Sequence, residues 1–228
     1  MTTLTHDQAR AFYDRFGARQ DRQAFYEDAA TDELIAHADF EHAGSVLEFG
    51  CGTGRFAQRL FEKHLPDDCT YRGVDVSSTM VALAKERLGP WRDRAQIELS
   101  DGSMKLRLED GAADRIVSNY VLDLLSDEDT DALVAEAHRA LRPGGLLCLA
   151  SLTYGATRPA RAVSWLWRRL HAWRPRWVGG CRPIRLLDYL PTDSWRIDYH
   201  KVVTRWCLSS EVVVARRLPT GEDAGGDG

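Results

Sequence analysis

Residues 46–56 read Val46-Leu47-Glu48-Phe49-Gly50-Cys51-Gly52-Thr53-Gly54-Arg55-Phe56, and this stretch decides the fold. It begins as a short apolar strand, continues as a turn with glycine at every second position, and ends as the first turn of a helix. Glycines at 50, 52 and 54 let the backbone bend tightly and let a ligand approach with no Cβ in the way. The stretch therefore predicts a site for a nucleotide-like cofactor.

Strands and helices alternate along the chain from this turn onward. We therefore expect an α/β fold, a Rossmann-like doubly wound sheet of seven strands that is mostly parallel and ends in an antiparallel C-terminal hairpin. N-terminal helices and a helical insert before the last two strands complete the expected fold. The predicted strands lie at 46–49, 70–76, 95–99, 115–120, 146–151, 195–204 and 210–215.

Helix ends carry local signals. Ser77 or Ser78 is the expected N-cap of the helix after the second strand, and Ser126 begins a later helix at capping-box spacing. The run Arg142-Pro143-Gly144-Gly145 predicts the end of that later helix. We divide the chain into a helical lid at 1–43, a main domain at 44–218 with a substrate-covering insert at 152–190, and a disordered tail at 219–228.

Composition sets further limits. A chain of 228 residues fits one α/β domain, and a net charge of −4 disfavours nucleic acid as a partner. We expect a cytoplasmic protein, because the first residues lack a basic segment followed by an apolar core and no apolar run approaches the roughly 20 residues of a membrane helix. Five cysteines without a CxxC pair, and histidines without HxH or HxxxH spacing, predict neither a disulfide framework nor a metal site.

The glycine spacing and the acids that follow narrow the choice of cofactor. A dinucleotide fingerprint is GxGxxG, but here the third glycine comes one residue early and Arg55 takes its place. Asp75 and Asp101 end the second and third strands, so one carboxylate can accept both ribose hydroxyls and the other can meet an adenine amino group. Several acids, Glu48 included, suit a cationic sulfonium ligand better than a pyrophosphate. Asp75 could instead cap a helix, and Asp101-Gly102 could be a plain turn.

Five successive motifs strengthen this interpretation: VLEFGCGTG, YRGVDVS, SDG, DRIVSNYVLDLL and LRPGGLLCLAS. With them, residues 44–151 resemble the class I S-adenosyl-L-methionine-dependent methyltransferases, of the broad type that includes quinone and phospholipid methyltransferases. The resemblance implies that S-adenosyl-L-methionine is bound and S-adenosyl-L-homocysteine released. The residues that it assigns to the cofactor are Glu48, Phe49, Gly50, Cys51, Gly52 and Gly54 around the methionine, Asp75 at the ribose, Val76, Met80, Asp101, Gly102 and Ser103 around the adenine, and Asn119 and Tyr120 near the sulfur.

Candidates for the chemistry are fewer. Many members of the family have a histidine pair or an aromatic residue after the fourth strand, whereas this chain has Asp123-Leu124-Leu125. Asp123 is therefore a candidate general base, together with Tyr13 of the N-terminal segment, while Asn119 and Tyr120 would lie near the methyl group. Asn119 could instead satisfy a backbone group, and Asp123 could be a solvated loop acid. Cys51 is expected to be a small packing residue.

The insert predicts the nature of the acceptor. No acid occurs between Glu136 and Asp188, whereas ten arginines and four of the seven tryptophans do. A helical projection gathers Ala162, Trp165, Leu166, Leu170 and Trp173 into an apolar stripe opposite Ser164, Arg168 and His171. We expect a cover for an anionic or aromatic small molecule or a lipid, or a surface that rests on an anionic membrane. A helix packed on the domain with solvated arginines is the plain alternative.

The sequence thus predicts a methyltransferase that acts on a small molecule or lipid by in-line displacement. One alternative is a non-catalytic subunit or sensor that binds S-adenosyl-L-methionine. Another is a nicotinamide-dependent oxidoreductase, which Arg55 disfavours because it stands where the third glycine of a dinucleotide fingerprint belongs.

Overall fold

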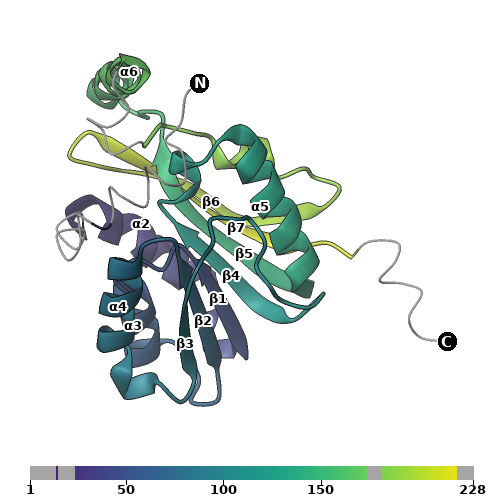
Figure 1. Ribbon diagram of the computed structural model, residues 1–228. Helices are drawn as coiled ribbons and strands as arrows, with labels where there is room; N and C mark the ends of the chain where they lie inside the picture. Colours follow the sequence, from purple (N-terminus) through teal and green to yellow (C-terminus); the bar gives the residue numbers. More distant parts are fainter. Residues whose placement is uncertain (1–13, 15–23, 174–180, 220–228) are drawn as a thin grey trace.

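The computed structural model describes residue 14, residues 24–173 and residues 181–219 (Figure 1). Much of the expected lid at 1–43 lies outside these residues, as does Tyr13. The expected tail at 219–228 also lies outside them, except for Pro219.

Within the described residues, seven strands form one sheet in the order β3-β2-β1-β4-β5-β7-β6. The first five strands run parallel, and β7 is antiparallel to both of its neighbours. The expected Rossmann-like sheet with an antiparallel C-terminal hairpin is confirmed. The strands are β1 (Ser45–Phe49), β2 (Thr70–Asp75), β3 (Ala95–Leu99), β4 (Ala113–Asn119), β5 (Leu141–Thr153), β6 (Trp195–Arg205) and β7 (Leu208–Arg217).

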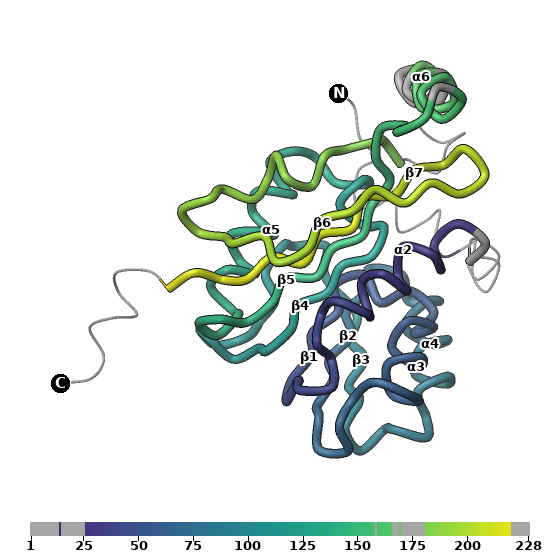
Figure 2. The backbone as a smooth tube through the Cα atoms, turned by 180° about the vertical axis from the view of Figure 1, so that it is seen from behind, coloured from purple at the N-terminus to yellow at the C-terminus, as the bar shows by residue number. Residues whose placement is uncertain are grey.

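Helices cover both faces of this sheet (Figures 1 and 2). Neighbouring residues of a strand enter opposite cores, so that Val46 packs with α3 and α4 while Leu47 packs with α5. Residues of α2 belong to the same core as α3 and α4, over the β5, β6 and β7 end of the sheet. The helices are α2 (Ala24–His37), α3 (Arg55–Lys63), α4 (Ser78–Arg87), α5 (Asp127–Ala140) and α6 (Arg158–Trp173), with short 3-10 turns η2 (Phe40–His42), η3 (Gly89–Trp91), η4 (Leu122–Leu124) and η6 (Leu186–Tyr189).

Two of the expected helix starts are confirmed. The Ser77 hydroxyl accepts a hydrogen bond from the backbone N–H of Met80 at 3.2 Å and caps α4. The Ser126 hydroxyl accepts one from the backbone N–H of Asp129 at 3.0 Å and caps α5. Each cap satisfies one of the backbone donors that a helix start leaves without a partner.

Helix α5 ends at Ala140, just before Arg142-Pro143-Gly144-Gly145, which agrees with the expected helix stop. These four residues themselves lie within β5, which the sequence did not predict. Leu141 pairs with Ala113 of β4, and the register then shifts, so that the four residues form an irregularity opposite the next part of β4. Gly144 has a φ of 80°, a conformation that a glycine adopts without strain. Gly144 and Gly145 thus lie at an irregularity in the pairing of the parallel strands β4 and β5.

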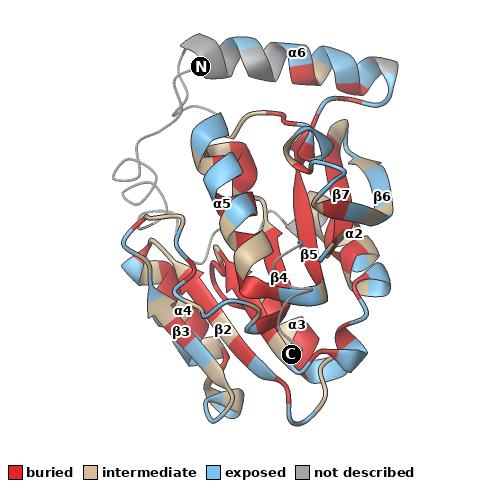
Figure 3. Cartoon of the chain, turned by 90° about the vertical axis from the view of Figure 1, so that its right-hand side faces the viewer, coloured by how far each residue is buried: buried red, intermediate tan, exposed pale blue. Residues whose placement is uncertain are grey.

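The expected orientation of the insert helix is also wrong. In α6 the side chain of Ser164, expected on the solvent face, is buried, whereas Ala162 and Trp165 of the expected apolar stripe are exposed. The reason is a specific contact, because the Ser164 hydroxyl accepts a hydrogen bond from the buried backbone N–H of Gly155 at 2.9 Å. Figure 3 shows that α6 extends beyond the end of the sheet. Only a narrow face of the helix therefore contacts the rest of the protein.

Membrane-spanning helices and clusters of metal-ligating side chains are absent from the part of the chain that the structure describes. None of its helices combines the length and the apolar composition needed to cross a membrane. None of its His, Cys, Asp and Glu side chains gather in threes that could hold a metal ion. All five cysteines are free thiols.

Candidate functional site

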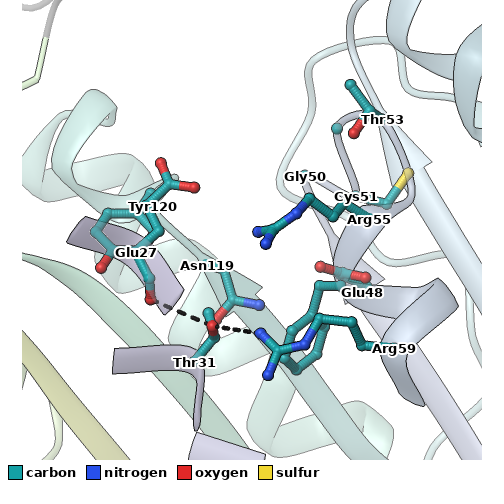
Figure 4. Close-up of a pocket in the computed structure, with 12 residues that line it drawn as sticks. Glu27, Thr31, Glu48, Gly50, Cys51, Thr53, Arg55, Arg59, Asn119 and Tyr120 are labelled. Carbon is teal, nitrogen blue, oxygen red and sulfur yellow. Dashed lines mark hydrogen bonds between the residues drawn. The ribbon is translucent and has the colours of Figure 1, made fainter. Parts of the chain in front are cut away.

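A cavity that is open to solvent lies where β1 and β4 end at the carboxyl edge of the parallel strands. In doubly wound sheets, ligands bind outside this edge. Figure 4 shows Glu27 and Tyr120 on one side of the cavity and the glycine turn on the other. The lining residues are Glu27, Thr31, Glu48, Gly50, Cys51, Gly52, Thr53, Arg55, Phe56, Arg59, Asn119 and Tyr120.

The glycine turn has the shape that its sequence predicts. Gly50, Gly52 and Gly54 have φ values of 78°, 53° and 74°, in the left-handed region that favours glycine. The turn is fixed to β2, since the backbone N–H groups of Gly50 and Cys51 donate to the Val74 carbonyl at 2.8 and 3.1 Å. Burial raises the pKa of the Cys51 thiol well above its usual value, which agrees with a packing role for this residue.

Asp75 stands at the end of β2, beside the glycine turn. Its two carboxylate oxygens accept hydrogen bonds from the backbone N–H groups of Gly52 and Ser77, each at 2.9 Å. Burial raises the pKa of this carboxyl, while the two backbone donors oppose that shift. These contacts lock the orientation of the side chain, and each oxygen retains acceptor capacity for a ligand hydroxyl.

Glu48 lies under the same cavity at the end of β1. It is 2% exposed, and its carboxylate accepts a hydrogen bond from the Tyr71 hydroxyl at 2.5 Å. Burial raises the pKa of Glu48 to about 8, against the effect of the Tyr71 hydroxyl. A cationic ligand in the cavity would favour the ionised carboxylate and would lower this pKa.

Asn119 and Tyr120 close the cavity from the end of β4. Both polar atoms of the Asn119 side chain are buried, and the amide lies close enough to the Glu48 carboxyl to lower the pKa of that group. Tyr120 has a φ of 56° and donates its hydroxyl to Ser210 at 2.8 Å, so its ring is held at the cavity wall. Buried amides normally have partners, so the Asn119 side chain has the donor and acceptor capacity to bind a ligand here.

Sequence reasoning missed the lining residues of two helices, which are Glu27 and Thr31 of α2 and Arg55, Phe56 and Arg59 of α3. Burial raises the pKa of the Glu27 carboxyl to about 7, with its neighbour Tyr26 opposing the shift. Glu27 and Thr31 are four residues apart, as are Arg55 and Arg59, so each pair shares one helix face.

Two matched pairs of charges join α2 to α3 beside the cavity. Both terminal nitrogens of Arg55 bind the carboxylate of Asp28, at 2.7 and 2.9 Å, and Arg59 binds Asp32. The acids and the arginines are each spaced by four residues, and this complementary spacing was the signal available in the sequence. A bidentate arginine contact fixes geometry as well as distance. The two pairs therefore hold α2 against the helix that begins at the glycine turn.

The residues expected around adenine are spread over the ends of β2 and β3, and the cavity described above does not include them. Asp101 is exposed, and its oxygens accept from the Ser103 backbone N–H at 2.9 Å and from Arg107 at 2.7 Å. The Ser103 side chain, with the Ser103 backbone N–H and Arg107, lowers the pKa of Asp101 to about 2. Met80 is buried in α4 and Gly102 is buried beyond β3, with Val76 and Ser103 half-buried. Their assignment to adenine stays a prediction.

Asp123 occupies a closed position behind the cavity, in η4. It is fully buried, which contradicts the alternative of a solvated loop acid. Burial raises the pKa of its carboxyl to about 7, and neighbouring Cys181 and Ser151 side chains oppose the shift. Its charge also affects the hydroxyls of Tyr26 and Tyr120. The structure thus brings Asp123 near the candidate site without exposing it to the cavity.

The buried carboxyl of Asp123 makes the stability of the protein depend on pH. Folding raises the pKa of Asp123 from 3.8 to about 7. At a pH between these two values, the carboxyl keeps its proton in the folded state and has lost it in the unfolded state. The free energy of unfolding should therefore fall as pH rises from about 4 to about 7, by on the order of a few kcal/mol from this group. Asp123→Asn should flatten that part of the profile in urea denaturation. Asp131→Asn, at an exposed position of α5, should leave it unchanged, and equal profiles for both variants would contradict the assignment.

Comparisons with known proteins agree with this geometry. Residues 46–145 match a family described as "Methyltransferase domain". A carboxy-S-adenosyl-L-methionine synthase of Chromohalobacter salexigens is 33% identical over 138 residues, which are 60% of this chain and 50% of that protein. The chain spans about half the length of the curated relatives it matches.

Solved structures show the same fold. The [4+2]-cyclase SpnF has a TM-score of 0.71 and 17% sequence identity, with 96% of this chain and 99% of that chain covered. The geranyl diphosphate C-methyltransferase of Streptomyces coelicolor, solved with S-adenosyl-L-homocysteine, has a TM-score of 0.63 and 14% identity, with 84% of this chain and 76% of that chain covered. At these identities the likeness concerns the fold.

Proposed function

We propose that the protein is an S-adenosyl-L-methionine-dependent methyltransferase that transfers a methyl group to a small-molecule or lipid acceptor, since residues 46–145 match the methyltransferase domain family. S-adenosyl-L-methionine supplies an electrophilic methyl group on a sulfonium ion. The neutral product is S-adenosyl-L-homocysteine. We include in this proposal that the acceptor is a quinone or a phospholipid.

One observation carries the proposal: the cavity at the glycine turn brings several carboxyl groups together with a buried amide. Glu48 and Glu27 line it, Asp75 stands beside the same turn, and the buried Asn119 amide lies beside Glu48. Both arginines of the lining are paired with acids, so the carboxyl groups, ionised by a bound cation, suit an amino-bearing ligand with a ribose diol better than a pyrophosphate. The residues present therefore fit S-adenosyl-L-methionine better than a dinucleotide.

The chain's own contribution to the reaction is alignment. In-line displacement requires the acceptor atom, the methyl carbon and the sulfur to lie on one line, and alignment supplies roughly 7–11 kcal/mol in favourable intramolecular reactions. We propose that Asn119 and Tyr120 form the surface that aligns the methyl group with the acceptor. Tyr120 is held in place by its hydrogen bond to Ser210 and by an edge-to-face contact with Tyr26, whose ring centre lies 5.7 Å from its own. The arginine pairs between α2 and α3 help to keep Glu27 beside Tyr120.

An acceptor that must lose a proton needs a base. We assign that role to Asp123, since a carboxyl with a pKa of about 7 takes up a proton near neutral pH. Because Asp123 is buried, proton transfer to it requires the acceptor or a neighbouring hydroxyl to reach behind Tyr120. A soft carbon or a thiolate acceptor would need positioning alone.

The experiment is a turnover assay with S-adenosyl-L-methionine and a panel of acceptors that includes anionic aromatic molecules and phospholipids. We expect S-adenosyl-L-homocysteine and an acceptor that has gained one methyl group, in equal amounts by mass spectrometry. Consumption of the cofactor into a product that keeps a modified sulfonium would contradict methyl transfer and would favour chemistry like that named for the Chromohalobacter relative. Binding of the cofactor without turnover of any acceptor would favour a sensor or subunit.

A further inference from the structure

Helix α6 presents a basic and aromatic stripe to solvent. Arg161, Trp165 and Arg169 follow one another at four-residue steps and are all exposed, with Trp165 58% exposed. The guanidinium of Arg169 lies over the Trp165 ring at 5.1 Å from its centre. An arginine stacked on an exposed tryptophan forms a flat surface that is apolar at the ring and positive at its rim.

The opposite face of α6 fixes this orientation. Ala160 and Ser164 are buried, and the Ser164 hydroxyl accepts the backbone N–H of Gly155. A Cβ on Gly155 would lie 2.1 Å from the backbone of Ala160, so the helix approaches this glycine as closely as the chain permits. Because Ala160 and Ser164 pack against the domain, Arg161, Trp165 and Arg169 on the other face of α6 point to solvent.

A second exposed tryptophan lies at the same end of the molecule. The hairpin between β6 and β7 carries Trp206, which is 80% exposed, next to exposed Arg205. Figures 1 and 2 agree in placing this hairpin tip beside α6. Trp206 has a φ of 50°, a conformation that costs energy for a side chain other than glycine. Trp165 and Trp206, both exposed, thus share one end of the molecule.

The charge at this end is positive, although the whole chain carries −4. Exposed Arg185 lies over the ring of exposed Tyr154 at 5.6 Å, where β5 leads into α6. The sequence has no acid between Glu136 and Asp188 to neutralise these arginines. Because β5 ends at the carboxyl edge of the parallel strands, this end of the molecule is also the edge at which the candidate site lies.

We propose that α6 and the tip of the β6–β7 hairpin form a docking surface for an anionic phospholipid membrane. Trp165 and Trp206 enter the interface between headgroups and acyl chains, where amphipathic rings are favoured. Four arginines bind lipid phosphates around them, namely Arg161, Arg169, Arg185 and Arg205. The protein lies on the bilayer without crossing it, and the carboxyl edge of the sheet faces the lipid.

The test is sedimentation of the full chain with vesicles of phosphatidylglycerol and phosphatidylcholine in equal parts, and with phosphatidylcholine alone. We expect binding to the anionic vesicles, with little binding to the neutral ones and a loss of binding as salt shortens the screening length from about 10 Å at 0.1 M to about 3 Å at 1 M. Trp165→Ala with Trp206→Ala should weaken binding at least about ten-fold, since each ring loses its apolar contact. Arg161→Gln with Arg169→Gln should weaken it about 25-fold, at about five-fold for each charge.

A charge control is available at the opposite end of the sheet. Arg92 is exposed at the amino end of β3, so Arg92→Gln removes one charge without touching the docking surface. It should leave vesicle binding unchanged, and all variants should keep the unfolding midpoint and the S-adenosyl-L-homocysteine affinity of the parent chain. Equal binding to neutral vesicles would overturn the proposal. It would also be overturned if the tryptophan and arginine variants bound like Arg92→Gln, or if single-stranded RNA bound more tightly than the anionic vesicles did.

Discussion

Gly50→Ala is expected to destabilise the folded protein by roughly 2–5 kcal/mol. Two costs add up to this value: alanine is strained in a left-handed backbone conformation, and its Cβ overpacks the site. Gly50 has a φ of 78°, and a Cβ built there would lie 2.2 Å from the Val121 Cγ2 atom. A β-branched side chain has few rotamers by which to move away. The same shift would distort the turn that lines the candidate cofactor site, so the affinity for S-adenosyl-L-homocysteine should fall as well.

Gly89→Ala is the matched control for this substitution. Gly89 begins η3, and a Cβ there would meet nothing within 4 Å. Its free energy of unfolding should change by less than about 0.5 kcal/mol, as is usual for surface positions without special contacts. Urea denaturation of the two variants measures the difference. Equal midpoints would mean that the turn tolerates a side chain and that its glycines are not required by the fold.

Asp75→Ala is expected to weaken S-adenosyl-L-homocysteine binding about 100-fold or more, if Asp75 accepts the two charge-assisted hydrogen bonds from the ribose hydroxyls that we assign to it, at about 1.5–3 kcal/mol each. It also leaves the backbone N–H groups of Gly52 and Ser77 without their acceptors. Asp75→Asn retains one carbonyl oxygen and should lose less affinity. Isothermal titration calorimetry measures all three proteins.

Two comparisons isolate the role of Asp75 in ribose binding. Asp93→Ala removes an exposed carboxylate at the amino end of β3 and should leave the affinity unchanged. The parent chain should bind adenosine more tightly than 2′,3′-dideoxyadenosine, and Asp75→Ala should abolish that preference. If the preference survived in Asp75→Ala, another residue would hold the ribose.

The sheet could be predicted from sequence because its signals are local. Strand lengths follow the apolar runs, and the caps at Ser77 and Ser126 depend on contacts three residues apart. The inclusion of Arg142-Pro143-Gly144-Gly145 in β5 depended instead on pairing with β4, which is distant in the chain. The orientation of α6 was decided by a single buried hydroxyl at Ser164, whose partner Gly155 lies outside the helix. An apolar stripe in the sequence gives a periodicity but does not say which face packs.

Some residues of the candidate site could be predicted from the sequence, and others could not. Residues on strand ends and in the glycine turn, such as Glu48, Asp75 and Asn119, follow from the topology of a parallel sheet. Glu27 and Thr31 could not be found like this, because α2 precedes the first strand and its place over the sheet depends on distant contacts, among them buried Leu34 and the ion pair of Asp28 with Arg55. The same ion pair explains why an arginine follows the third glycine of the turn.

The most direct test of the cofactor assignment is a calorimetric titration of the full chain with S-adenosyl-L-homocysteine and, separately, with NADH. We expect S-adenosyl-L-homocysteine to bind at micromolar affinity or tighter, about −8 kcal/mol or below, and NADH not to bind measurably. Binding of NADH in place of S-adenosyl-L-homocysteine, or of neither ligand, would contradict the account.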